Sequence, residues 1–303
     1  MNTKSLSATV FAVAAAAAFL ATAVTSQSVA HAQEINPQTV LYGEISGEKL
    51  PLDIYQPAKG DAPHPGVVLI HGGAGSFGKR TELSDHAAAL ASAGYVVFNI
   101  DYRLLRPDGS NQWPAQLDDA QLAVRWVRAN ASRYNADPER ICAFGHSFGG
   151  QLAALLGMRD TPEGRDLPLA AYSSRVACVI DIAGPVDPTQ PLPNASVQPA
   201  TTALMGGTAK DVPERYNDSS PLAQVAADTA PFLIFHGTND KEVSVEDSRR
   251  LVEALHANGV AVVYAEFPSV GHFDWIKPSP FGGWSLAGPE TLAFLEQILH
   301  YPN

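Results

Sequence analysis

The sequence predicts an α/β fold in which a mostly parallel sheet is covered by helices on both faces. After a Pro- and Gly-rich link at 57–65, short unbroken apolar runs alternate with longer segments of helical periodicity. The runs lie at residues 67–70, 95–100, 141–144, 177–182, 232–235 and 262–267. Strands that are apolar on both faces are typical of a parallel sheet buried between helices.

An antiparallel hairpin is expected before these runs, at residues 39–55. Leu50, Leu52 and Ile54 alternate with polar residues, and 44–48 has the composition of a turn. The hairpin and the six runs together give an eight-stranded sheet in one domain.

Helical periodicity is clearest in three segments. Apolar residues recur at helical spacing within 114–133 and within 245–256, and a last helix is expected to begin near Pro289. Residues 185–221 are rich in Pro, Ser, Thr and Asn. We expect them to form an irregular surface excursion that contributes to a functional rim, too short to be a large cap.

Residues 1–32 have the pattern of a secretory signal peptide. Lys4 precedes an apolar run at 8–24, which is followed by the small-residue cleavage site Ala30-His31-Ala32. The most apolar part, 10–21, is shorter than the ~20 residues of a spanning helix. We therefore expect cleavage rather than membrane anchorage, and an exported domain at 33–303 that is periplasmic or secreted.

Charge and motif content limit the partners of the chain. The formal net charge of −11 argues against nucleic acids and anionic membrane surfaces. The sequence contains neither an HExxH motif nor paired CxxC motifs, so no metal or other cofactor is expected.

The only two cysteines, Cys142 and Cys178, fall in apolar runs that we expect to be neighbouring strands. Export would permit them to pair. A bridge between adjacent strands usually needs poor geometry, so two buried free thiols are expected instead.

A serine between two glycines is the strongest chemical signal in the chain. The segment 141–150 runs from an apolar stretch through Gly145-His146-Ser147-Phe148-Gly149 into an Ala- and Leu-rich one. This is the pattern of a nucleophile elbow, a strained strand-to-helix turn that presents a serine hydroxyl to a substrate. Because Gly and Ser are common, context must separate this elbow from an ordinary Gly-rich turn.

A serine nucleophile needs a histidine base and a carboxylate, and both follow later strands. Ligands bind at the carboxyl ends of strands in such sheets. Asp240 comes just after the run at 232–235, and His272 comes just after the run at 262–267. Asp181 and Asp187 remain alternatives for the acid. His71, His146 and His236 lie at other strand ends in the wrong chain order for the base, so they are expected to be hydrogen-bonding supports.

The tetrahedral intermediate of acyl transfer also needs hydrogen-bond donors for its oxyanion. The run at 67–70 leads directly into a Gly-rich turn at 71–75, whose backbone N–H groups can face inward. The N–H of Phe148 follows the nucleophile. These two sources of backbone donors are sufficient.

Five motifs in this order resemble the α/β-hydrolase superfamily, in its esterase branch similar to hormone-sensitive lipase and feruloyl-esterase-like carboxylesterases. They are His71-Gly72-Gly73-Ala74, Asp101-Tyr102-Arg103, Gly145-His146-Ser147-Phe148-Gly149-Gly150, His236-Gly237-Thr238-Asn239-Asp240 and Gly271-His272. The resemblance implies a triad of Ser147, Asp240 and His272, and oxyanion donors at Gly73, Ala74 and Phe148. Family members usually have a third glycine where Ala74 stands.

Two further expectations concern the edge of the site. Arg103 is expected to form an ion pair rather than to bind substrate. Large aromatic residues near the expected site suggest an aromatic rim for an acyl or aryl group, although core packing explains some of them equally well. These residues are Trp113, Trp275, Phe281 and Trp284.

The function expected from these features is a serine carboxylesterase acting on short-chain or aryl esters, with a small-molecule ester as its partner. One alternative is a serine peptidase of the prolyl-oligopeptidase kind. Another is a catalytically silent binding protein on a hydrolase scaffold, since a fold alone does not establish function.

Overall fold

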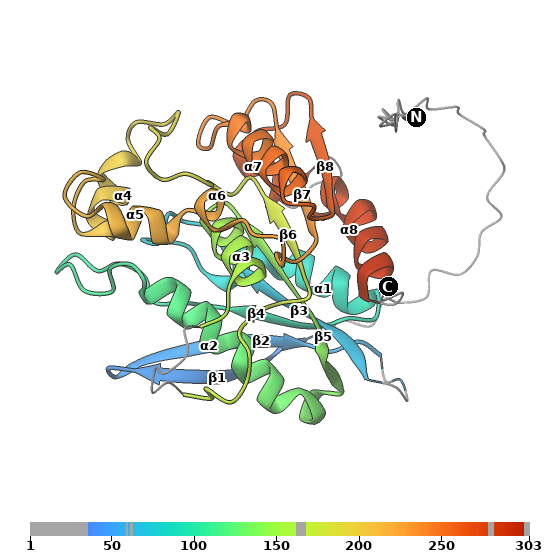
Figure 1. Ribbon diagram of the computed structural model, residues 1–303. Coiled ribbons are helices and arrows are strands. Elements are labelled where there is room, and N and C mark those ends of the chain that lie inside the picture. The colour runs from blue at the N-terminus through green and yellow to red at the C-terminus, as the bar shows by residue number, and fades with distance from the viewer. Residues whose placement is uncertain (1–35, 59, 61–62, 162–167, 278–281, 300–303) are drawn as a thin grey trace, which may run out of the picture. The chain divides into compact units, whose positions relative to one another are not determined.

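One eight-stranded sheet organises the computed structural model, which describes residues 36–58, 60, 63–161, 168–277 and 282–299 (Figure 1). The sheet order is β1-β2-β4-β3-β5-β6-β7-β8. Its strands are β1 (Gln38–Ile45), β2 (Glu48–Tyr55), β3 (His64–Ile70), β4 (Val96–Ile100), β5 (Ala136–His146), β6 (Cys178–Ile182), β7 (Phe232–Gly237) and β8 (Val262–Phe267). The predicted signal peptide at 1–32 lies outside the described residues.

The sheet is parallel from β4 to β8, and its amino-terminal hairpin is antiparallel. β1 pairs antiparallel with β2, and β2 pairs antiparallel with β4. The remaining neighbours pair parallel. The fold prediction of a mostly parallel eight-stranded sheet with an amino-terminal hairpin is therefore confirmed.

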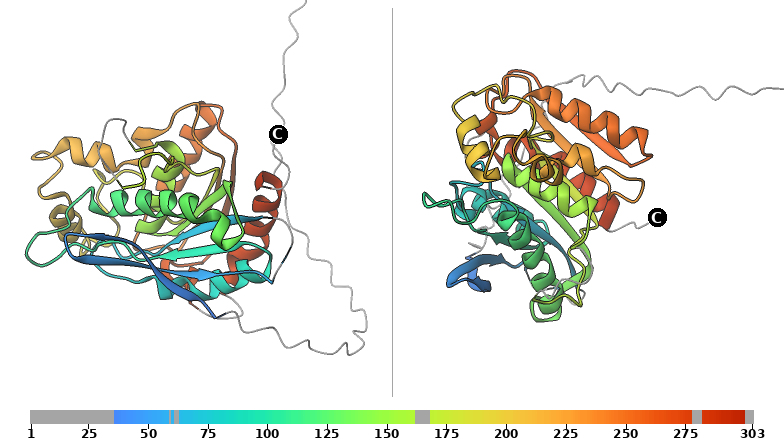
Figure 2. Two further views of the ribbon diagram at one scale, coloured as in Figure 1. Left: turned by 90° about the horizontal axis from the view of Figure 1, so that it is seen from below. Right: turned by 60° about the vertical axis from the view of Figure 1, so that its left-hand side comes forward.

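Helices cover both faces of the sheet and bury a separate apolar core on each. On one face lie α2 (Ala115–Asn130), α3 (Phe148–Met158) and α7 (Val245–Ala257). The other face is covered by α1 (Ser84–Ser92) and α8 (Trp284–Leu299). Figure 2 shows α2 and α3 along the same side of the sheet. None of the helices in the described part of the chain is long and apolar enough to cross a membrane.

Two sequence predictions about helices are wrong. The segment 185–221 is not irregular, because it contains α4 (Gln198–Met205) and α5 (Pro213–Ser219), and α6 (Pro221–Gln224) ends it. Each of these short helices has a proline in its first turn, where the missing N–H costs no hydrogen bond. The last helix begins at Trp284 rather than near Pro289. Its early start buries Ala287 in the core.

The prediction of two free thiols is also wrong, since Cys142 and Cys178 form a disulfide. They are register partners on the neighbouring parallel strands β5 and β6. Their Cα atoms are 4.7 Å apart, which lies within the range that disulfides span. The two cysteines lie directly opposite each other on neighbouring strands, which brings them close enough to bond. The sequence does not reveal this register.

Candidate active site

Ser147 lies in a strained turn between β5 and α3. Its backbone φ is 58° and its ψ is −125°, in the positive-φ region that non-glycine residues rarely adopt. A β-carbon at Gly149 would lie 2.0 Å from the carbonyl oxygen of Ile70, and one at Gly145 would lie 2.0 Å from that of Gly149. The glycines of the elbow are thus required by the close approach of helix to strand.

Three side chains from three strand ends meet at this turn. The Oγ of Ser147 lies 2.8 Å from Nε2 of His272, and Nδ1 of His272 lies 2.7 Å from Oδ2 of Asp240. Asp240 follows β7, and His272 begins the 3₁₀ helix η3 (His272–Trp275) after β8. The structure therefore brings the three predicted residues into one hydrogen-bonded chain.

The carboxyl group of Asp240 is held in its charged form. Burial opposes ionisation, but hydrogen bonds from His236, His272 and the Val243 N–H outweigh it and lower the pKa of Asp240. A carboxylate only accepts hydrogen bonds, so Nδ1 of His272 donates to it. Nε2 is then left to accept the proton of the Ser147 hydroxyl.

Three other histidines act as supports, as the sequence predicts. Nε2 of His146 lies 2.9 Å from the carbonyl oxygen of His272. Burial, with a smaller effect of the His272 charge, lowers the pKa of His146 to about 3, so it stays neutral and donates this bond. His236 bonds Ser248 Oγ at 2.7 Å, and His71 donates to the carbonyl oxygen of Gly72 at 2.7 Å.

The alternative acids occupy other places. The Oδ1 of Asp181 accepts the N–H of Gly184 at 2.9 Å, and Asp187 pairs with Arg250 at 2.7 Å. Neither is hydrogen-bonded to His272, whose carboxylate partner is Asp240.

The Gly-rich loop after β3 turns back toward the nucleophile. Gly73, Ala74 and Gly75 have φ values of 110°, 49° and 70°. The carbonyl oxygen of Gly73 accepts the N–H groups of Ser76 and Phe77, which closes the turn. This folding places Gly73 and Ala74 in the wall of the pocket that contains Ser147.

Phe148 supplies a third amide at the same wall. It is the first residue of α3, so its N–H has no acceptor within the helix. Among the described residues, none of the amides of Gly73, Ala74 and Phe148 donates to a backbone carbonyl outside the regular helices and strands. All three residues are thus available as donors to an oxygen bound beside Ser147.

Tyr102 supports this loop without entering the pocket, and its neighbour Arg103 is held by α2. The hydroxyl of Tyr102 donates to the carbonyl oxygens of His71 and Gly72, at 3.0 and 3.1 Å. The guanidinium of Arg103 forms a bidentate pair with the buried Asp119, with Nη2 2.7 Å from Oδ1. The expectation that Arg103 is an ion-pair residue is confirmed.

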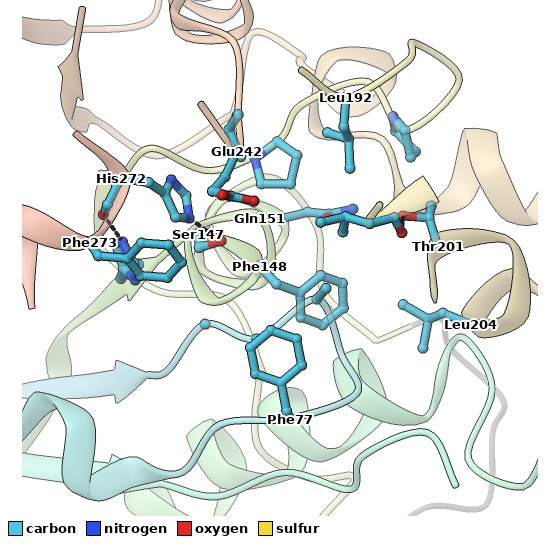
Figure 3. Close-up of a pocket in the computed structure, with 18 of the residues that line it drawn as sticks. Phe77, Ser147, Phe148, Gln151, Leu192, Thr201, Leu204, Glu242, His272 and Phe273 are labelled. Carbon is cyan, nitrogen blue, oxygen red and sulfur yellow. Dashed lines mark hydrogen bonds between the residues drawn. The ribbon is translucent and has the colours of Figure 1, made fainter. Parts of the chain in front are cut away.

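The pocket beside Ser147 is walled mainly by apolar side chains of the loop after β3 and of the 185–221 segment (Figure 3). They include Phe77 of the loop and Leu192, Val197, Leu204 and Met205 of the segment, and Phe148 at the start of α3 joins them. The predicted position of 185–221 at the rim of the site is therefore confirmed, and its functional role stays a prediction. Proline-rich composition and length are the sequence signals that identify this segment, but they do not predict which of its side chains line the pocket.

The predicted aromatic rim is wrong for the three tryptophans. Trp113 is buried and donates its indole N–H to Asp218 at 2.7 Å. Trp275 is fully buried against Phe235 and Phe267, and Trp284 packs edge-on against His86. They belong to the cores because large aromatic rings fill interior volume. Phe281 lies outside the described residues.

No group of three or more His, Cys, Asp or Glu side chains in the described part of the chain could hold a metal ion. The groups at the site itself are those of proton transfer and hydrogen bonding.

Comparisons with known proteins agree with this geometry. The chain matches the BD-FAE family over residues 52–255. It is 31% identical over 281 residues to the esterase LipC of Mycobacterium tuberculosis, a match that covers 88% of this chain and 66% of LipC. The chain thus spans slightly less than two thirds of that relative's length.

Two solved structures share the fold over most of the chain. A truncated carbohydrate esterase from gut microbiota has a TM-score of 0.74 at 26% identity, covering 89% of this chain and 99% of that one. Thermogutta terrifontis Est2 with bound propionate has a TM-score of 0.71 at 25% identity, covering 89% and 95%.

Proposed function

Since this chain belongs to the BD-FAE family, within the α/β-hydrolase superfamily, we propose that it is a serine carboxylesterase. The observation that carries the proposal is the continuous chain from Asp240 through His272 to Ser147, beside a pocket with three backbone donors. Each component of acyl transfer has a residue in place: nucleophile, base, orienting acid and oxyanion donors.

The reaction follows from these distances. His272 accepts the hydroxyl proton while Ser147 Oγ attacks the ester carbonyl, and the N–H groups of Gly73, Ala74 and Phe148 stabilise the developing oxyanion. His272 then protonates the leaving alcohol as the C–O bond breaks, which gives an acyl-enzyme. Water, activated by the same imidazole, releases the acid and regenerates Ser147.

We propose short-chain or aryl carboxylic esters as substrates. The pocket wall beside Ser147 is largely apolar, which suits a small acyl or aryl group. Est2, whose structure contains propionate, and the carbohydrate esterase from gut microbiota provide precedents for small acids and for sugar esters respectively.

The test is Ser147→Ala against a panel of nitrophenyl esters of increasing acyl length. Loss of the attacking oxygen should reduce kcat/KM by at least about 10⁴-fold, with the circular dichroism spectrum and melting temperature close to those of wild type. Retained turnover by a folded Ser147→Ala variant would end the proposal.

Two further measurements on the wild-type protein distinguish an esterase from a silent scaffold and from a peptidase. A silent scaffold would not react with a fluorophosphonate probe, whereas an active serine hydrolase is labelled at Ser147. A peptidase would cleave the amide matched to the best ester with comparable efficiency, and we expect the ester to be strongly preferred.

We also propose that the chain is exported after removal of residues 1–32. The supports are the signal-like composition of that segment and the pairing of Cys142 with Cys178, which an oxidising compartment favours. Amino-terminal sequencing of the protein recovered from a bacterial periplasm or medium should begin near residue 33. Recovery only from the cytoplasm, with Met1 intact, would contradict export.

A further inference from the structure

A carboxylate faces the pocket from the loop that also carries the acid of the triad. Glu242 lies two residues after Asp240, and its N–H donates to Oδ1 of Asp240 at 2.8 Å. Its Oε2 accepts a hydrogen bond from Nδ2 of Asn194 at 2.7 Å. In Figure 3 the Glu242 carboxylate is directed toward the part of the pocket that holds Ser147 and His272. Glu242 is thus a fixed side chain of the site, held from both its backbone and its carboxylate.

This negative charge has no cationic partner in the described part of the molecule. No Lys or Arg is among the described residues that line the pocket, whereas a second carboxylate, Glu82, is. The described ion pairs include none to Glu242, and its polar partner, Asn194, is neutral. An unpaired carboxylate in a partly enclosed pocket acts on a bound charge more strongly than one in open water.

The mechanism assigns Glu242 to one side of the substrate. The leaving alcohol must lie next to Nε2 of His272, because that nitrogen donates its proton. Glu242 lies on the same side of the substrate as His272. It belongs to the loop that carries Asp240, and Asp240 is hydrogen-bonded both to His272 and to the N–H of Glu242. The acyl group then faces the apolar wall that includes Leu204 and Val197.

An exposed aromatic ring borders the same side. Phe273 directly follows His272, is 48% exposed and stands perpendicular to the His272 ring with 5.2 Å between centroids. An aromatic face attracts a cation, and it does so in addition to a nearby carboxylate.

We infer that Glu242 is a specificity-determining residue that favours esters whose alcohol carries a positive charge, such as a quaternary ammonium. The inference rests on the proposed esterase function and names the alcohol class for that site. Glu242 attracts the cationic alcohol, and Phe273 contributes an apolar, polarisable surface beside it.

The experiment compares two esters of one acid, a choline ester and the 3,3-dimethylbutyl ester, which has the same shape without the charge. The acid is the one whose nitrophenyl ester the enzyme hydrolyses best. Wild type should show a kcat/KM for the choline ester roughly three- to tenfold above that for the neutral ester. Glu242→Gln should raise the KM for the choline ester more than the KM for the neutral ester, so that the ratio of the two kcat/KM values falls to nearly one.

The control is Glu290→Gln, which removes the same charge from an exposed position on α8. It should keep the wild-type preference. A wild type without preference, or a preference that survives Glu242→Gln, overturns the inference. An equal fall in kcat/KM for both esters would also overturn the inference, because Glu242 would then act through Asp240 and His272. Nitrophenyl ester turnover is followed in parallel, so a failed inference is distinguished from an inactive enzyme, which would overturn both proposals.

Discussion

At the scale of single residues, the carboxyl group of Asp181 is buried next to the turn that carries Ser147, and its pKa is raised. It is fully buried on β6, opposite Gly145 of β5. Its Oδ1 accepts the Gly184 N–H, but its Oδ2 has no hydrogen-bond partner among the described residues. Burial raises the pKa of Asp181 to about 7. The side chain is therefore neutral in mildly acidic solution and becomes a buried charge above neutrality.

This shift predicts a stability that falls as pH rises. An unfolded aspartate has a pKa of about 3.9, so the folded value is the higher one. Such a group contributes stability that is complete below pH ~4 and is lost as pH rises through about 7. Asp181→Asn does not ionise. Between pH 5 and pH 8 the free energy of unfolding of wild type should fall, relative to Asp181→Asn, by about 2 kcal/mol.

The matched control is Asp187→Asn, measured by urea unfolding at the same two pH values. Burial opposes ionisation of Asp187, but hydrogen bonds from Arg250 and Thr189 outweigh it and lower its pKa. Asp187 is charged throughout this range, so its difference from wild type should not change with pH. A pH-independent difference for Asp181→Asn would show that Asp181 is ionised in the folded protein.

At the scale of elements, the junction of β5 and α3 depends on the absence of a side chain. A β-carbon at Gly149 would lie 2.0 Å from the Ile70 carbonyl oxygen and 2.5 Å from that of His71, and backbone atoms cannot move aside easily. Gly149→Ala should lower the free energy of unfolding by at least about 3 kcal/mol or displace Ser147 and abolish turnover.

Gly66 on β3 provides a matched comparison, because a β-carbon there meets its nearest atom, on Ile141, at 3.5 Å. Gly66→Ala should cost about 1 kcal/mol or less and keep activity. Urea unfolding and nitrophenyl ester turnover of both variants check the prediction. Equal effects of the two substitutions would mean that the close approach at the elbow is not required.

The elements that the sequence predicts well are those with a local signature. β8 is predicted at its observed bounds from an apolar run, and the sequence predicts Ser147, Asp240 and His272 because each follows such a run. The walls of the pocket lack a local signature. α4 forms although Thr201 and Thr202 disfavour helix, and its Leu204 reaches the pocket only through tertiary packing.

The same limit explains the errors in the aromatic residues and the cysteines. An indole ring such as that of Trp275 has the same composition in a core as at a rim, so its position depends on neighbouring elements, here Phe235 and Phe267. The pairing of Cys142 with Cys178 depends on the register of β5 against β6. Register is a property of the assembled sheet, and short apolar runs do not specify it.

At the scale of the whole molecule, the disulfide joins two central strands and encloses the elbow. It links residues 36 positions apart, and the loop between them contains Ser147 and all of α3. Both cysteines are fully buried in the core that α1 and α8 cover. A reductant therefore reaches the sulfurs only when this part of the sheet opens.

Removing this link should destabilise the protein without altering the chemistry. Closing a loop of this length in the unfolded chain contributes about 3–4 kcal/mol, so Cys142→Ala/Cys178→Ala should have a free energy of unfolding lower by about that amount. Below the melting temperature its kcat for the nitrophenyl ester should remain within about twofold of wild type, because neither sulfur lines the pocket. Thiol titration of the denatured, unreduced wild-type protein should find no free thiol. Two free thiols per chain, together with unchanged stability of the double variant, would mean that the sheet is held by packing alone and that export contributes nothing to its stability through this bond.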